Sequence, residues 1–275
     1  MERNSIIVFI HPLHARLNKW LINRLRKKKM MVICMIGDIN GLKDGDPELL
    51  NFETGQLKDF EFFIVHNQGM LDWLNSAMPG KMASMIEFFD FLTAPVNKQP
   101  IYSKKIVFAG NLDKSKFLKD LEQLPLQFNL YGPGISTDVM DQSNVQYHGI
   151  IDPYELPAKL EGSYGLVWDG DSIYGMNGSL GNYMQYISHH KLSLYILAGL
   201  PIIVSCSAGS APLIKKYKIG FCVSSLLEIN NKISRITSDE YQEMVSNTLP
   251  LAKKIAEGKC LLAAINELIG ETVSS

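Results

Sequence analysis

The sequence lacks the features that mark a secreted, disulfide-bonded or membrane-spanning protein. Cys34, Cys206, Cys222 and Cys260 are scattered and form no C-x-x-C pair, which predicts thiols in a reducing compartment and no disulfide framework or zinc site. No apolar run reaches the roughly 18 to 20 residues needed to span a bilayer. The opening segment has no small-residue cleavage site, so we expect no secretion and a cytoplasmic location.

An excess of charge of one sign is also absent. The chain has 27 basic and 28 acidic residues, and this balance predicts no nucleic-acid partner, since no overall positive field attracts phosphate backbones. What is present is an ordinary globular composition, with 46% hydrophobic and 20% charged residues among 275. This composition excludes disordered and collagen-like chains, and the length allows two modest domains with a core each.

Short apolar runs alternate with segments of helical spacing, a pattern typical of an α/β protein whose parallel sheets are covered by helices. In the first part we expect strands at 6–10, 31–36, 62–65 and, more weakly, 82–86, and helices at 17–29 and 68–76. In the second part we expect strands at 105–109, 127–131, 145–148, 164–168, 201–205 and 220–223, and helices at 115–123, 183–197, 213–216 and, almost unbroken, 238–269.

The segment at 95–104 contains two prolines and few apolar residues, which predicts a linker. We therefore expect one α/β lobe over residues 1–94, a linker over 95–104, and a second α/β lobe over 105–275 with a long helical tail. The first lobe is expected to be short or truncated. Two Rossmann-type lobes place ligands in the cleft between them, at the carboxyl ends of strands.

Two strand-to-helix turns of the second lobe carry residues suited to phosphate. After the strand at 105–109, Gly110 allows close approach of the backbone, Asn111 offers a donor and an acceptor, and Lys114 can neutralise charge. At the start of an apolar helix, Lys191 and Ser193 would lie where N–H groups and a positive helix end hold an anion. A solvated lysine explains the first turn as well as phosphate binding does, and explains the second turn better when it is taken alone. The occurrence of both turns in one lobe favours a nucleotide diphosphate site.

Four segments in this order resemble a bacterial group of GT-B glycosyltransferases: FAGNLDKSKFL, FNLYGPG, VQYHGIIDPYELPAKLEGSYGLVWDG and HHKLSLYILAGLPIIV. The group includes β-1,6-galactofuranosyltransferases of surface-polysaccharide synthesis and the glucosyltransferases that extend glycans on serine-rich adhesins. The resemblance is strongest from about residue 100 onward. It implies a UDP-linked sugar donor held by the second lobe, a glycan or lipid-linked glycan acceptor, no cofactor beyond the donor, and a homo-oligomer.

The resemblance also implies particular donor-binding residues. Asn111 and Lys114 match the family element that follows Gly110, and Lys191 matches the lysine of its helix start, together with Leu192, Ser193 and Tyr195. Tyr131 and Gly132 follow a strand end where base or ribose contacts are expected. His189 and His190 depart from the family pattern, which leaves their role open.

The triplet Asp169-Gly-Asp171 has two interpretations. In the other large glycosyltransferase fold a D-x-D triplet holds a divalent cation that carries the diphosphate, because hard cations prefer carboxylate oxygens. Short triplets are common by chance, so we expect no metal. We expect Asp169 near the hydroxyls of the donor sugar and Asp171 in solvent.

An inverting transfer, which the family's products imply, needs a base for the acceptor hydroxyl. The first lobe offers Asp38, at a position where relatives carry an acid, and His14 as a second candidate beside His11. A turn or capping role is the competing explanation for Asp38. A buried or turn role competes for both histidines.

The segment from Arg16 to Lys29 carries seven basic residues and no acid, interleaved with apolar residues at helical spacing. A solvated helix face explains it, and so does a peripheral contact with anionic lipid at the inner face of the membrane or with a lipid-diphosphate acceptor.

The leading hypothesis is an inverting, metal-independent glycosyltransferase that moves galactofuranose or glucose to a surface glycan. The alternative is a non-catalytic nucleotide-binding subunit of a glycosylation complex. A two-lobed solute-binding protein is disfavoured by the expected lack of an export signal.

Overall fold

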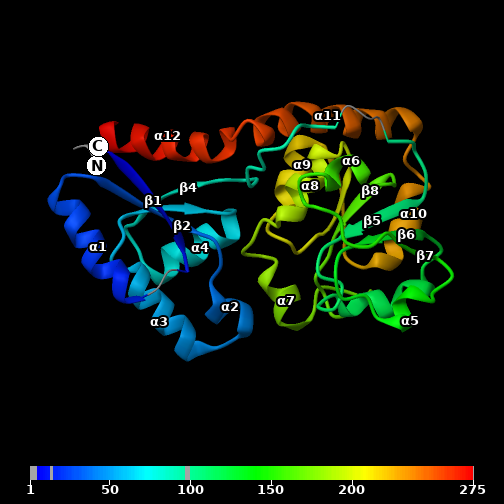
Figure 1. Cartoon of the computed structure of the whole chain (residues 1–275), viewed down its shortest axis with the longest axis horizontal. Coiled ribbons are helices and arrows are strands. Elements are labelled where there is room, and N and C mark those ends of the chain that lie inside the picture. Colours follow the sequence, from blue (N-terminus) through cyan, green and yellow to red (C-terminus); the bar gives the residue numbers. More distant parts are fainter. Residues whose placement is uncertain (1–4, 13–14, 97–99, 275) are drawn as a thin grey trace. The chain divides into compact units, whose positions relative to one another are not determined.

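The structure, a computed structural model, describes residues 5–12, 15–96 and 100–274; residues 15–19 and 271–274 are described by their backbone alone. The chain forms two compact units, each built on a parallel sheet, as the alternation of apolar runs predicts (Figure 1). The α/β prediction is confirmed. None of the helices in the described ranges combines the length and apolar composition that crossing a bilayer requires.

Unit 1 is a sheet of four parallel strands in the order β1-β2-β3-β4. On one face, alternate residues of β2 (Val32, Cys34 and Ile36) pack with buried side chains of helices α1 and α4. On the other face the Ser84 hydroxyl donates to the carbonyl of Ala264 in α12 at 2.8 Å. The elements of this unit are β1 (Ile6–His11), α1 (Ala15–Lys27), β2 (Met31–Ile36), α2 (Asn40–Asp44), α3 (Pro47–Leu57), β3 (Phe62–Val65), α4 (Gln68–Ala77), β4 (Met82–Met85) and α12 (Lys259–Ser274).

Unit 2 is a six-stranded parallel sheet in the order β10-β9-β8-β5-β6-β7. Phe108, Phe128 and Trp168 are fully buried in the apolar cluster that fills one face of this sheet. The elements are β5 (Lys105–Ala109), η1 (Lys116–Gln123), β6 (Gln127–Tyr131), α5 (Thr137–Met140), β7 (Val145–Tyr147), α6 (Leu156–Lys159), β8 (Tyr164–Val167), α7 (Gly178–Tyr183), α8 (His190–Leu197), β9 (Ile202–Ser205), α9 (Ala211–Tyr217), β10 (Gly220–Val223), η2 (Leu226–Glu228), α10 (Ile229–Ile233) and α11 (Ser238–Ala256).

The division into units differs from the expected domains 1–94 and 105–275. Unit 1 comprises Met1–Glu87, Gln185–Ile187 and Leu261–Ser275, and unit 2 comprises Phe88–Met184 and Ser188–Cys260. The described residues of the expected linker, 95–96 and 100–104, belong to unit 2, where the Val96 N–H donates to the Leu197 carbonyl at 3.0 Å. The expected helical tail is divided between the units: α11 belongs to unit 2, whereas Ala264 and Leu268 of α12 are buried in unit 1.

Two expected helices are each interrupted. The helix expected at 183–197 starts only at His190, because Tyr186 and Ile187 pack against the core of unit 1 instead of continuing a helix. The tail is broken between α11 and α12 at Gly258, whose φ of +71° is a backbone conformation that suits glycine after a helix end. Both interruptions lie within a few residues of a boundary between the two units.

Candidate active site

A pocket of about 430 Å³ lies in unit 2 where strand β5 ends and helix α8 begins. The carboxyl ends of parallel strands are where such sheets bind ligands, and the first turn of a helix directs N–H groups outward. Three expected donor-binding residues, Gly110, Lys191 and Ser193, line this pocket. The other lining residues are Asp90, Phe91, Ala109, Pro153, Leu156, His190 and Leu194.

The ammonium group of Lys191 is held in place from two sides. Its Nζ atom lies 2.9 Å from Oδ1 of Asp169 and 4.3 Å from the centre of the Phe108 ring. The lysine side chain is only 17% exposed. A cation over an aromatic face and against a carboxylate is attracted to both, so the charge stays at the pocket wall. Phe108 is a site residue that sequence reasoning missed, because an apolar strand residue gives no signal of such a contact.

Asp169, which follows strand β8, binds two residues of the segment that starts α8. Oδ2 of the carboxylate lies 3.2 Å from Nε2 of His189, while Oδ1 binds Lys191. His189, which departs from the family pattern, is therefore a second residue in contact with Asp169. The Asp169 carboxylate therefore lies between the Lys191 ammonium group and the His189 imidazole.

Gly110 and Gly132 shape the floor of the site because neither position accepts a side chain. Gly110 has a φ of +156°, and a methyl group there would lie 2.9 Å from Cε of Lys191. A methyl group at Gly132 would overlap the carbonyl oxygen of Gly110. The turns after β5 and β6 are therefore pressed together, and Gly110 leaves room for the Lys191 stem.

Hydroxyl groups fix helix α8 against its surroundings. The buried Tyr195 hydroxyl accepts from the Ala109 N–H at 2.9 Å and donates to the Leu166 carbonyl at 3.1 Å, so it joins α8 to β5 and β8. Burial raises the pKa of Tyr195 far above its usual range, and the phenol stays protonated. The Ser193 hydroxyl donates to the Phe89 carbonyl at 2.6 Å. Its predicted contact with the donor stays a prediction.

The remaining expected donor-binding residues lie away from the pocket wall. Asn111 and Lys114 are exposed in the turn after Gly110, where the Lys114 N–H donates to Oδ1 of Asn111 at 3.3 Å. The Leu192 side chain is fully buried, and its N–H donates to the His189 carbonyl. That Lys114 and Lys191 bind one pyrophosphate stays a prediction.

Tyr131 is almost completely buried at the end of β6. Its hydroxyl accepts from the Glu161 N–H at 3.0 Å, and its ring stacks on His148 with ring centres 4.6 Å apart. Burial raises its pKa to about 12. The Tyr131 side chain therefore packs within unit 2 at the carboxyl end of β6, and its expected contact with the base or ribose stays a prediction.

The two carboxylates of the D-x-D triplet bind different cations. Asp169 binds Lys191, whereas Asp171 lies 3.1 Å from Nζ of the exposed Lys116. Asp171 is thus in an ion pair rather than alone in solvent. Among the described residues no group of three or more histidine, cysteine, aspartate and glutamate side chains is arranged to hold a metal ion.

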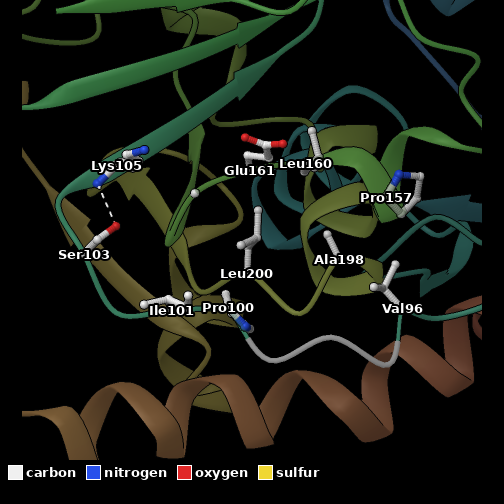
Figure 2. Close-up of a pocket in the computed structure, with 11 residues that line it drawn as sticks. Val96, Pro100, Ile101, Ser103, Lys105, Pro157, Leu160, Glu161, Ala198 and Leu200 are labelled. Carbon is white, nitrogen blue, oxygen red and sulfur yellow. Dashed lines mark hydrogen bonds between the residues drawn. The ribbon is translucent and has the colours of Figure 1, made fainter.

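A second pocket of unit 2, of about 320 Å³, is lined mainly by apolar side chains (Figure 2). It is bordered by Lys105 at the start of β5, by Gly162 before β8 and by Leu200 before β9. These positions belong to the amino ends of the strands, at the edge opposite the first pocket. Ligands of open α/β sheets bind at the carboxyl ends, so the pocket at Lys191 is the candidate active site.

In unit 1 the expected base Asp38 follows β2 and is half-buried, with Oδ2 3.4 Å from Nζ of Lys43. The turn that carries it is held by Glu53, whose carboxylate accepts the N–H groups of Asn40 and Gly41. Nε2 of the buried His11 lies 3.7 Å from the same carboxylate. His14 lies outside the described residues. Glu53 was missed because nothing in the sequence signals its buried position.

Two family models match this chain. The C-terminal domain of the glucosyltransferase 3-like family matches residues 106–268, and its N-terminal domain matches residues 1–80. The chain belongs to the glucosyltransferase 3-like family. The resemblance found in the sequence is thereby confirmed.

Curated relatives of this family member are glycosyltransferases. It is 26% identical to the β-1,6-galactofuranosyltransferase WbbI of Escherichia coli over 98% of this chain and 81% of that protein. It is 30% identical to glucosyltransferase 3 of Streptococcus gordonii over 62% of this chain and 51% of that protein.

Solved structures show that this glucosyltransferase 3-like chain has the GT-B fold. Sucrose-phosphate synthase from Thermosynechococcus elongatus superposes with a TM-score of 0.65 at 17% identity, over 98% of this chain and 74% of that one. HepE from Anabaena, in complex with UDP-glucose, superposes with a TM-score of 0.63 at 11% identity, over 98% and 79% of the two chains. At these identities the likeness establishes the fold alone.

Proposed function

We propose that this chain is an inverting glycosyltransferase that moves a hexose, galactofuranose or glucose, from a UDP-sugar to a hydroxyl of a surface glycan. The observation that carries the proposal is the Lys191 ammonium group at the wall of a pocket between the end of β5 and the start of α8. Donor class and reaction type are consistent with the named activities of the two curated relatives and with the UDP-glucose bound to HepE.

The donor would exchange one ion pair for another. In the structure Lys191 binds Asp169 at 2.9 Å, and a diphosphate brings more negative charge than a carboxylate. When Lys191 turns to the diphosphate, Asp169 retains His189 and becomes an acceptor for hydroxyl groups of the donor sugar. Lys191 then stabilises the charge that grows on the departing UDP.

The transfer forms a bond between the acceptor oxygen and the anomeric carbon, while the bond from that carbon to the UDP oxygen breaks. The electron pair leaves with UDP. Asp38 would take the proton of the acceptor hydroxyl, with His14 as the other candidate. No metal is part of the proposal, because Lys191 and the helix start supply the positive charge.

The test is an assay of UDP release from a panel of UDP-sugars, including UDP-glucose and UDP-galactofuranose, with and without sugar acceptors. We expect one donor to be consumed in an acceptor-dependent way and to raise the melting temperature. Stabilisation by UDP without transfer or hydrolysis of any donor would overturn the enzyme proposal in favour of a non-catalytic nucleotide-binding subunit. A cytoplasmic location and a homo-oligomer remain part of the proposal as expectations.

A further inference from the structure

One face of helix α1 combines an exposed tryptophan with exposed basic side chains. Trp20 is 61% exposed, and Arg24, Lys27 and Lys28 are exposed as well. The spacing of four and seven residues places Trp20, Arg24 and Lys27 on one side of helix α1, and Lys28 directly follows the helix. We call this set, Trp20, Arg24, Lys27 and Lys28, the Trp20 face.

The opposite side of the same helix holds it in unit 1. Ile22 and Leu25 are buried in the core of that unit, so helix α1 cannot turn its Trp20 face inward. Arg26 lies at the border, where it donates to the Asp59 carbonyl and lies 3.6 Å from Glu61. The fold therefore neutralises Arg26 within the protein.

Two side chains of the Trp20 face contact each other. The guanidinium carbon of Arg24 lies 5.3 Å from the centre of the Trp20 ring, a cation over an aromatic face. Lys28 and Lys29 continue the helical turn through N–H groups that donate to the Leu25 and Arg26 carbonyls. The positive charge is thus concentrated around the exposed indole, although the whole chain has a net charge of -1.

We propose that the Trp20 face docks on the surface of a bilayer that contains anionic lipid. An indole ring prefers the boundary between headgroups and acyl chains, and neighbouring lysines and arginines bind lipid phosphates while their stems lie along apolar surface. A nucleic acid would satisfy the charges but not the apolar part of the indole. The inference is independent of the donor pocket, since no residue of this face lies in unit 2.

The test measures binding of the full chain to vesicles of phosphatidylcholine alone and of phosphatidylcholine mixed with phosphatidylglycerol. We expect binding only to the mixed vesicles, weakened by salt. The double change Lys27→Glu and Lys28→Glu should lower the binding constant about 30-fold or more, because each basic residue contributes at the anionic surface. Trp20→Ala should lower it about fivefold by removing the apolar contact.

The matched control is the double change Lys119→Glu and Lys215→Glu, which alters the net charge equally at exposed positions of unit 2. It should leave vesicle binding within about twofold of the wild type. Stabilisation by UDP, retained in every variant, shows that each is folded and that the donor site is unaffected. No binding to the mixed vesicles, equal binding to both kinds, equal loss in the control, or equally tight binding to duplex DNA would overturn the proposal.

Discussion

The Nζ atom of Lys191, a residue that lines the pocket at the end of β5 and the start of α8, lies 2.9 Å from Oδ1 of Asp169. The other carboxylate oxygen lies 3.2 Å from Nε2 of His189. An incoming anion can therefore compete with the Asp169 carboxylate for the Lys191 ammonium group. It leads to different expectations for the lysine and for the carboxylate.

Replacing Lys191 with methionine, which keeps the stem over Phe108, should weaken UDP binding roughly 10-fold to 100-fold. A charge-assisted hydrogen bond contributes about 1.5 to 3 kcal/mol, and about 1.4 kcal/mol corresponds to a factor of ten. Isothermal titration with UDP measures the change. Lys119→Met, in the exposed part of η1, serves as the control and should bind UDP as the wild type does. Unchanged affinity in Lys191→Met would remove the lysine from the site.

Asp169→Asn should separate nucleotide binding from sugar transfer. The neutral amide no longer competes for Lys191, so UDP should bind as tightly as in the wild type or a few times more tightly. Turnover of the UDP-sugar should fall about tenfold or more, because the amide is a weaker acceptor for sugar hydroxyls. Titration with UDP beside a transfer assay tests both parts. A parallel loss of UDP affinity and turnover would instead make Asp169 a structural support of the pocket.

Gly110→Ala should damage the site through a clash. Its methyl group would lie 2.9 Å from Cε of Lys191, at a φ of +156° that side chains rarely adopt. We expect weaker UDP binding and a loss of stability of about 1 to 3 kcal/mol. The control is Gly55→Ala in helix α3, where nothing lies within 4 Å. That change should stabilise the protein by about 0.5 to 1 kcal/mol. Thermal melting and UDP titration of both variants decide the matter.

Asp38→Asn should lower kcat for transfer by about 100-fold to 10,000-fold, the usual contribution of a general base. Affinity for UDP should stay at the wild-type value, since the donor pocket is built from residues of unit 2. The expected loss should shrink at high pH, where more of the acceptor hydroxyl reacts without a base. Wild-type kcat in the variant would transfer the role to another group, such as His14.

The stability of the chain should depend on pH through His11. Burial lowers the pKa of this histidine more than Glu53, 3.7 Å away, raises it. The folded chain therefore binds the proton less readily than the unfolded chain, whose histidine has a pKa near 6.5. Stability should be full above that value and fall as the pH drops below about 6.5.

The measurement is the melting temperature of the wild type and of His11→Gln between about pH 7.5 and pH 5. The wild type should lose more stability than the variant over this range. His148, whose pKa burial also lowers, is present in both proteins and cancels in the comparison. Parallel pH dependences would show that His11 does not titrate within the fold.

Most strands were predictable because a short apolar run is typical of a parallel sheet that is covered on both faces. Helices α2 and α3 were missed, although Asp46 followed by Pro47 carries the signal. The Asp46 carboxylate accepts the Glu48 and Leu49 N–H groups at the start of α3. The position of α12 could not be predicted, because helical periodicity marks an apolar face without saying which sheet it covers.

The candidate active site, too, could be predicted only in part from the sequence. The motifs placed Gly110 and Lys191 in one lobe, and the structure places them in one pocket, because parallel topology gathers strand ends at a single edge. The roles of Phe108 and His189 could not be predicted. The contact of the Phe108 ring with Lys191 and that of the His189 imidazole with Asp169 depend on side-chain packing, which the sequence does not show. The hydrogen bond from the Glu161 N–H to the Tyr131 hydroxyl could not be predicted either, because it joins two residues thirty positions apart.

The most direct test of the account is a structure of the full chain with UDP. We expect the diphosphate within hydrogen-bond distance of the Lys191 ammonium group and against the turn at Gly110, with Asp169 still bound to His189. UDP bound with its diphosphate away from Lys191, for example in the apolar pocket beside Lys105 and Leu200, would contradict it.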